Sequence, residues 1–167
     1  TQPSPAKAHQ KSITVRQHAD DLMQLANTMP KPPAIVAHSF GAAYVYDYLA
    51  RGGPAAGACF LAPVPPSGNA AMVGRLLRRS PAKALLVTRA LAFKGAARSP
   101  DLARAVFFDD SMPAEALERY VQRFADDSRV GLDLGDYQRN LPSVAARADG
   151  SAPWADSLPT CVIGGRA

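Results

Sequence analysis

The sequence predicts an α/β fold in which a segment of parallel sheet carries a helical insertion. Three observations lead to this prediction. In residues 34–51, A-I-V-A-H-S-F-G-A-A-Y-V-Y-D-Y-L-A-R, an apolar strand pattern stops at a serine and a helical pattern begins at once. A second apolar run, Ala58–Ala62, follows that helix, and strand, helix, strand is the order of a parallel βαβ unit. A third run, in residues 158–167, comes only after a long stretch of short helical patterns separated by prolines.

These patterns divide the chain into four parts. We expect a polar leader over residues 1–12, a core over 13–62, a helical cap over 63–157 and the next core strand over 158–167. In the core, the apolar residues between Ile13 and Met29 predict a helix that stops at Pro30. The glycines and the proline of residues 51–54 end the helix that follows the serine.

The cap has two features that bear on function. Residues 114–125 predict an amphipathic helix, whose apolar stripe either packs on the domain below or lines a substrate pocket. No acidic residue lies between Asp47 and Asp101, and the basic residues of that window are Arg51, Arg75, Arg78, Arg79, Lys83, Arg89, Lys94 and Arg98. This basic face either contacts an anionic lipid or substrate, or is simply solvated, and the solvated interpretation is favoured.

The turn at Ser39 carries the chemistry that the sequence predicts. On a sharp turn from strand to helix a serine adopts an unfavourable backbone conformation, and its hydroxyl stands clear of the sheet. Such a turn brings the positions two before and two after the serine together, and here they are the small residues Ala37 and Gly41. His38 adjoins the serine, but neighbouring side chains of a strand point to opposite faces. We therefore expect His38 to be a structural residue beneath the turn rather than a catalytic base.

The pentapeptide A-H-S-F-G resembles the G-x-S-x-G signature of the α/β-hydrolase family, with Ala37 in place of the first glycine. The resemblance implies that Ser39 is a nucleophile and that the backbone N–H of Phe40 is one oxyanion donor. It also implies an incomplete α/β-hydrolase fold and a serine hydrolase that cleaves carboxylic esters or lipids through an acyl-enzyme. A small-molecule or lipid-like ester is then the expected substrate.

The similarity extends into the cap. Residues 61–69, 105–113 and 119–129 resemble the cap of plant- and alga-type members of this family, which are described as lipase-like or esterase-like. The similar region runs from about Ile13 to Ala167. Two alternatives stay open: a binding protein of the same fold that has lost catalysis, and an acyltransferase, which shares the acyl-enzyme with a hydrolase.

The order of catalytic residues in this family is nucleophile, acid, histidine. The sequence has three histidines, His9, His18 and His38, and none follows Ser39. The run L-P-T-C-V-I-G-G-R-A at the end resembles the family strand that leads to the catalytic aspartate. We therefore expect an internal fragment of a longer hydrolase that is inactive alone. The acid, the histidine and the second oxyanion donor are expected outside it.

Other chemistries and compartments receive less support. No cofactor and no metal site are expected, because the sequence has neither a zinc-ligand spacing nor a phosphate-binding glycine motif. Nucleic-acid binding is not indicated, since no recognised module is present. No apolar run is long enough to predict a transmembrane segment, and no secretory signal is visible. Cys59 and Cys161, on strands predicted to be buried, form no disulfide framework. A soluble protein of the cytoplasm or plastid is expected rather than a secreted one.

Overall fold

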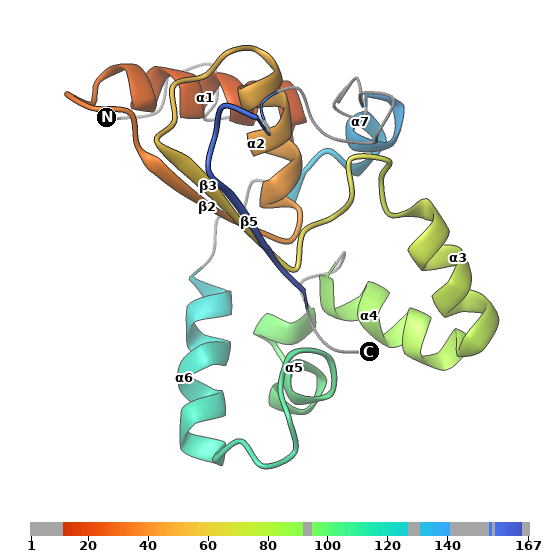
Figure 1. The fold of residues 1–167 in the computed structure, drawn as a ribbon. Coiled ribbons are helices and arrows are strands. Elements are labelled where there is room, and N and C mark those ends of the chain that lie inside the picture. Colours follow the sequence, from red (N-terminus) through yellow and green to blue (C-terminus); the bar gives the residue numbers. More distant parts are fainter. Residues whose placement is uncertain (1–11, 92–94, 127–130, 141–153, 155, 165–167) are drawn as a thin grey trace. The chain divides into compact units, whose positions relative to one another are not determined.

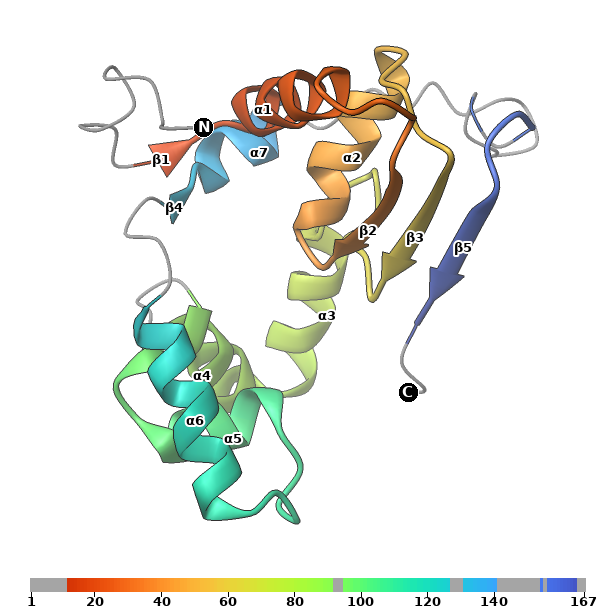
Figure 2. The ribbon, with the colours of Figure 1, turned by 90° about the vertical axis from the view of Figure 1, so that its left-hand side faces the viewer.

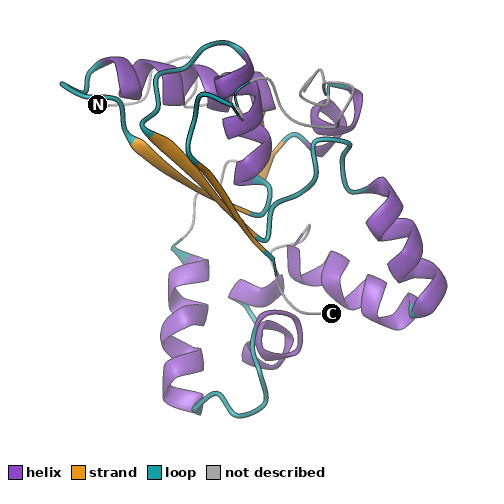
Figure 3. Ribbon diagram, viewed as in Figure 1, coloured by secondary structure: helices purple, strands orange, loops and turns teal. Residues whose placement is uncertain are grey.

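The computed structural model describes residues 12–91, 95–126, 131–140, 154 and 156–164. The chain forms two compact units, the first made of Thr1–Asn69 and Val130–Ala167 and the second of Ala70–Arg129. The elements of the first unit are β1 (Ser12–Ile13), α1 (Val15–Asn27), β2 (Ala34–His38), α2 (Gly41–Ala50), β3 (Gly57–Leu61), β4 (Gly131–Leu132), α7 (Leu134–Arg139) and β5 (Thr160–Ile163) (Figures 1 and 3). The predicted α/β fold is confirmed. None of the helices in the described part of the chain is long and apolar enough to cross a membrane.

The larger sheet of the first unit is parallel, with the strand order β2-β3-β5. Ala34 pairs with Gly57 and His38 with Leu61, and on the other side of β3 Leu61 pairs with Ile163. The three strands run in the same direction, so their carboxyl ends lie at one edge of the sheet (Figure 2). Ser39 directly follows the end of β2. This edge is where parallel α/β sheets assemble their sites.

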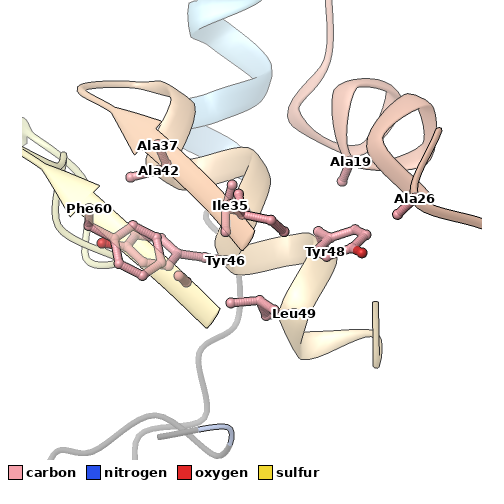
Figure 4. Close-up of a cluster of buried hydrophobic side chains, with 11 residues drawn as sticks. Ala19, Ala26, Ile35, Ala37, Ala42, Tyr46, Tyr48, Leu49 and Phe60 are labelled. Atoms are coloured by element: carbon pink, nitrogen blue, oxygen red, sulfur yellow. The ribbon is translucent and has the colours of Figure 1, made fainter. Parts of the chain in front are cut away.

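Helices α1 and α2 cover one face of the sheet. The buried residues of this core come from both helices and from β2 and β3: Ala19, Ala26, Ile35, Ala37, Ala42, Val45, Tyr46, Tyr48, Leu49, Ala58 and Phe60 (Figure 4). Phe60 on β3 is 2% exposed, and its ring centroid lies 5.0 Å from that of Tyr46 on α2. Small alanines on the helices and large rings between helix and sheet therefore bring α2 close to the strand that precedes it.

Local interactions fix where α1 begins and how it meets α2. Thr14 caps α1 with a capping box: its hydroxyl accepts the N–H of Gln17 at 3.2 Å, and the Gln17 side chain accepts the N–H of Thr14 at 3.0 Å. Asp47 on α2 accepts Arg16 of α1 at 3.1 Å and Arg51 at 3.2 Å. Arg51, which follows α2, also pairs with Asp20 of α1 at 2.6 Å. The Arg16–Asp47 and Arg51–Asp20 pairs join the two helices at the surface, although each contributes at most about 1 kcal/mol.

The turn after α2 depends on a glycine. Tyr48 is fully buried and donates a hydrogen bond from its hydroxyl to the carbonyl oxygen of Pro54. A Cβ atom at Gly53 would lie 2.4 Å from two atoms of the Tyr48 ring. Real Cβ atoms do not come so close, and the buried ring has little freedom to move away.

We expect Gly53→Ala to lower the free energy of unfolding by about 1–3 kcal/mol, because the methyl group overpacks the site of the Tyr48 ring. Denaturant titration followed by circular dichroism measures this change. Gly74→Ala is the matched control, since a Cβ there meets no atom within 4 Å and alanine favours the helix. An equal loss in both variants would contradict the proposed contact.

The expectation that the last strand is buried is wrong. All four residues of β5 are exposed, and Val162, paired with the buried Phe60, is 64% exposed. β5 lies at the sheet edge, and among the described residues no helix covers it. Cys161 is likewise exposed, and it lies in register with the half-buried Cys59. Both are free thiols, and desolvation, with a smaller contribution from a hydrogen bond to Cys161, raises the pKa of Cys59.

Part of the expected cap segment belongs to the first unit, where it forms a small sheet of its own with β1. β4 pairs in parallel with β1, and the N–H of Asp133 donates to the carbonyl of Ile13 at 3.0 Å. Asp136 on α7 accepts the N–H of Val15 at 3.1 Å, at the start of α1. Residues 131–139 are therefore tied to the first unit, and the second unit covers Ala70–Arg129 within the 63–157 segment.

The second unit is helical, with α3 (Ala70–Arg79), α4 (Pro81–Leu91), the short helix η2 (Gly95–Ala97), α5 (Pro100–Phe107) and α6 (Ala114–Ala125). Its core contains Leu117 of α6, together with Ala90, Ala96 and Ala103 of the neighbouring elements. Val121 and Phe124 pack against this cluster. The amphipathic helix is confirmed with its predicted bounds, Ala114–Ala125. The stripe packs within its own unit.

Candidate functional site

The backbone of Ser39 adopts the left-handed conformation, with φ of 53°. A non-glycine residue in this region costs about 1–3 kcal/mol and persists only where its surroundings fix it. Here three backbone hydrogen bonds do so. The N–H of Ser39 donates to the carbonyl of Leu61 at 3.1 Å, and its carbonyl accepts from Ala42 at 3.2 Å and Val64 at 3.1 Å. The turn from β2 to α2 is therefore held from both sides, and its strained backbone is the one that the sequence pattern predicts.

The small residues around the turn have unequal roles. Ala37, Ala42 and Ala43 are buried, and they let the start of α2 lie close to the sheet. Gly41 differs from expectation, because a Cβ atom there would meet nothing within 4 Å. The described residues therefore give no steric reason for glycine at position 41. Close packing begins one residue later, at the fully buried Ala42.

Phe40 opens α2 with ordinary helical backbone angles, φ −63° and ψ −22°. Its N–H donates to no described residue, in contrast to the N–H of Ser39. An unpaired N–H at the start of a helix lies in the positive field of the helix dipole, which favours a negative charge on a bound group. The geometry can thus offer one hydrogen-bond donor next to the Ser39 hydroxyl.

Tyr137 supports this residue from α7. Its ring meets the ring of Phe40 edge to face, with centroids 5.2 Å apart, and it lies in a buried cluster with Val15, Ala43 and Val64. Burial raises the pKa of its phenol, with a smaller electrostatic contribution from Tyr46. Although the side chain is 1% exposed, its hydroxyl has no hydrogen-bond partner among the described residues. The sequence offered no signal for this residue, because it lies about one hundred positions after the serine.

We expect Tyr137→Phe to leave the free energy of unfolding unchanged or raise it by up to about 1 kcal/mol, because it removes a buried hydroxyl without a partner. Denaturant titration measures the difference. The matched control is Tyr48→Phe, which removes a hydroxyl that does have an acceptor and should cost about 1–2 kcal/mol. A larger loss at Tyr137 than at Tyr48 would show that the Tyr137 hydroxyl makes an essential hydrogen bond.

His38 is placed differently from expectation. The side chain of His38 is exposed rather than lying beneath the turn, because β2 alternates and points Ile35 and Ala37 toward the helices. His18 on α1 is half-buried, and its ring stacks on Tyr44 with centroids 4.3 Å apart. Burial also raises the pKa of Tyr44.

A second strained residue lies at the same sheet edge, and sequence reasoning missed it. Ala62 follows β3 with φ of 41°, and its N–H donates to the carbonyl of Ile163 at 2.7 Å. Two residues later, Val64 donates its N–H to Ser39. The segment after β3 therefore connects the end of β5 to the serine turn. The small residue at position 62, directly after an apolar run, is the one signal that could have indicated it.

A model of the alpha/beta hydrolase family matches residues 5–167 of the chain. No match to the chain was found among curated proteins, and none was found among solved structures. The matched region includes β2, the turn at Ser39, and β5.

Proposed function

Because the chain belongs to the alpha/beta hydrolase family, we propose that Ser39 is the nucleophile of a serine hydrolase that cleaves carboxylic esters. One observation carries the proposal: Ser39 occupies a strained turn at the carboxyl end of β2 that three backbone hydrogen bonds maintain. Strain at a residue with a reactive side chain is typical of a functional site. An ordinary structural serine would gain nothing from this conformation.

The proposed reaction is acyl transfer. The Oγ atom of Ser39 attacks the ester carbonyl while a general base takes its proton. The N–H of Phe40 donates to the oxyanion of the tetrahedral intermediate. When the intermediate collapses, the bond to the alcohol breaks, the alcohol takes the proton, and the acyl group stays on Oγ. Water then attacks the acyl-enzyme, which releases the acid and restores the serine.

The general base is not assigned to a histidine of this sequence. His38 points away from the helices, and His18 stacks on Tyr44. The family order places the catalytic histidine after the nucleophile, and neither satisfies it. In the proposal this chain provides the nucleophile and one oxyanion donor, and the buried Ala37 and Ala42 let the turn pack closely.

The substrate class is proposed from the second unit. We assign Ala70–Arg129 as the cap, and its similarity to lipase-like and esterase-like caps favours a small-molecule or lipid-like ester. The unit combines apolar side chains with many arginines. This combination is compatible with an amphipathic substrate that has both an apolar part and a negatively charged group.

An active-serine fluorophosphonate probe tests the function. At its full natural length the protein should be labelled covalently, and mass spectrometry should find the label on Ser39. Labelled protein should also lose hydrolysis of simple aryl and acyl esters. A folded native protein that takes up no label would favour the non-catalytic alternative. Ester products formed with an added alcohol in preference to water would favour the acyltransferase.

A further inference from the structure

Helix α3 exposes an apolar stripe. None of its residues is buried, and Met72, Val73 and Leu77 are 51%, 39% and 52% exposed. Residues 72, 73, 76 and 77 lie on one face of a helix, because positions three and four apart are neighbours. By contrast, the amphipathic helix α6 buries Leu117 in the core of the same unit. The stripe of α3 is thus available for contact with another surface.

The arginines of α3 lie beside this stripe. Arg75, Arg78 and Arg79 share a second face by the same spacing, and all three are exposed. In the part of the chain that the structure describes, no ion pair joins them to an acidic side chain. No acidic residue occurs from position 48 to position 100. The helix therefore combines an apolar face with uncompensated positive charge.

The neighbouring helix α4 also exposes apolar and basic side chains. α3 and α4 pack against each other. Near the start of α4, Lys83 is exposed and Leu85 is 62% exposed. An apolar protein partner would account for the exposed leucines and the methionine, but not for the adjoining row of unpaired guanidinium groups. A surface that offers both hydrocarbon and anionic groups accounts for both features.

We propose that α3 docks on the surface of a bilayer that contains anionic lipids. A helix with this pattern lies in the interface plane, with its apolar side chains among the upper acyl chains and its arginines at the lipid phosphates. The docking goes beyond the function proposed for Ser39, because it needs no chemistry at the serine. It would bring a lipid-like ester and the cap to the same surface.

Vesicle flotation with the native protein tests the docking. The protein should float with vesicles of phosphatidylcholine and phosphatidylserine, and much less with vesicles of phosphatidylcholine alone. Added salt should weaken the binding, because each arginine near the anionic surface contributes about fivefold to the partition. Equal binding to both kinds of vesicle, or none to either, would overturn the proposal.

Two variants separate the contributions of the arginines and of the apolar side chains to vesicle binding. Arg78→Gln with Arg79→Gln should reduce partition about thirtyfold, and Met72→Gln with Leu77→Gln about tenfold or more. Each variant has a control with the same kind of change at another exposed position. Arg119→Gln with Arg123→Gln on α6 is the control for the arginine pair. Leu25→Gln with Met29→Gln is the control for the apolar pair, because these side chains are about as exposed as Met72 and Leu77. Far-UV circular dichroism should be unchanged in every variant, since all the altered side chains lie at or near the surface.

The outcomes distinguish the partner and the site. An equal loss of vesicle binding in the arginine variants of α6 and of α3 would overturn α3 as the docking element. Concentration-dependent self-association abolished by the Met72 and Leu77 changes, without vesicle binding, would identify a second copy as the partner instead. Ser39→Ala should float like the native protein. Its failure to react with the probe would therefore be independent of the docking result.

Discussion

Replacing Ser39 with alanine should abolish covalent labelling by a fluorophosphonate and reduce kcat/KM for ester hydrolysis by several orders of magnitude. The reason is that only the Oγ atom at this turn can form the acyl-enzyme, while the N–H of Phe40 still binds the oxyanion weakly. Losses of about 10⁴ to 10⁶ are found when a nucleophile of this kind is removed. Labelling and steady-state kinetics of the native protein and the variant measure both effects.

The fold should survive this substitution. Alanine keeps the three backbone hydrogen bonds of residue 39, so the free energy of unfolding should change by less than about 1 kcal/mol. Ser67→Ala, at an exposed loop position of the same unit, is the control and should keep full labelling. Undiminished labelling in the folded Ser39 variant would remove Ser39 from the mechanism.

Phe60→Ala should produce the largest loss of stability in the first unit, about 3–5 kcal/mol. The ring is 2% exposed, packs beside Tyr46, and lies between the sheet and the helices that position Ser39. Its removal leaves a cavity that the alanines around it are too small to fill. Denaturant titration gives the free energy of unfolding, and thermal unfolding should show a lower Tm.

A neighbouring residue provides the control for this loss. Val162 pairs with Phe60 across β3 and β5 but is 64% exposed, so Val162→Ala should cost less than about 1 kcal/mol. If the two variants lost equal stability, the helices would not be packing on the sheet through Phe60. The same comparison tests whether the edge strand is as exposed as the structure shows.

Local patterns were sufficient for several elements. The strand and helix around Ser39 follow from an apolar run that ends at one residue. α6 has the bounds that its sequence predicts, and β5 lies within the predicted run 158–167. These signals come from neighbours within a few positions, so no distant contact is needed to identify them. The strained serine was also predictable, because small residues and a strand-to-helix change demand a sharp turn.

Burial was the least predictable property. β5 has the apolar composition of a buried strand, yet its position at the sheet edge leaves it exposed among the described residues. His38 was expected beneath the turn and is exposed, because the helices cover the opposite face of β2. Composition indicates whether a side chain favours burial. The position of its strand in the sheet decides whether a helix covers the face on which that side chain lies.

By itself, the sequence determined the α/β class, the order of the core elements from α1 to β3 and the serine turn, because each depends on residue spacing along a short stretch of chain. Only the tertiary structure decided what fixes that turn. Val64 and Leu61 reach Ser39 from the end of β3, and Tyr137 reaches Phe40 from α7. Such contacts join residues that are far apart in sequence. Their partners are selected by the packing of strands and helices, which no local pattern specifies.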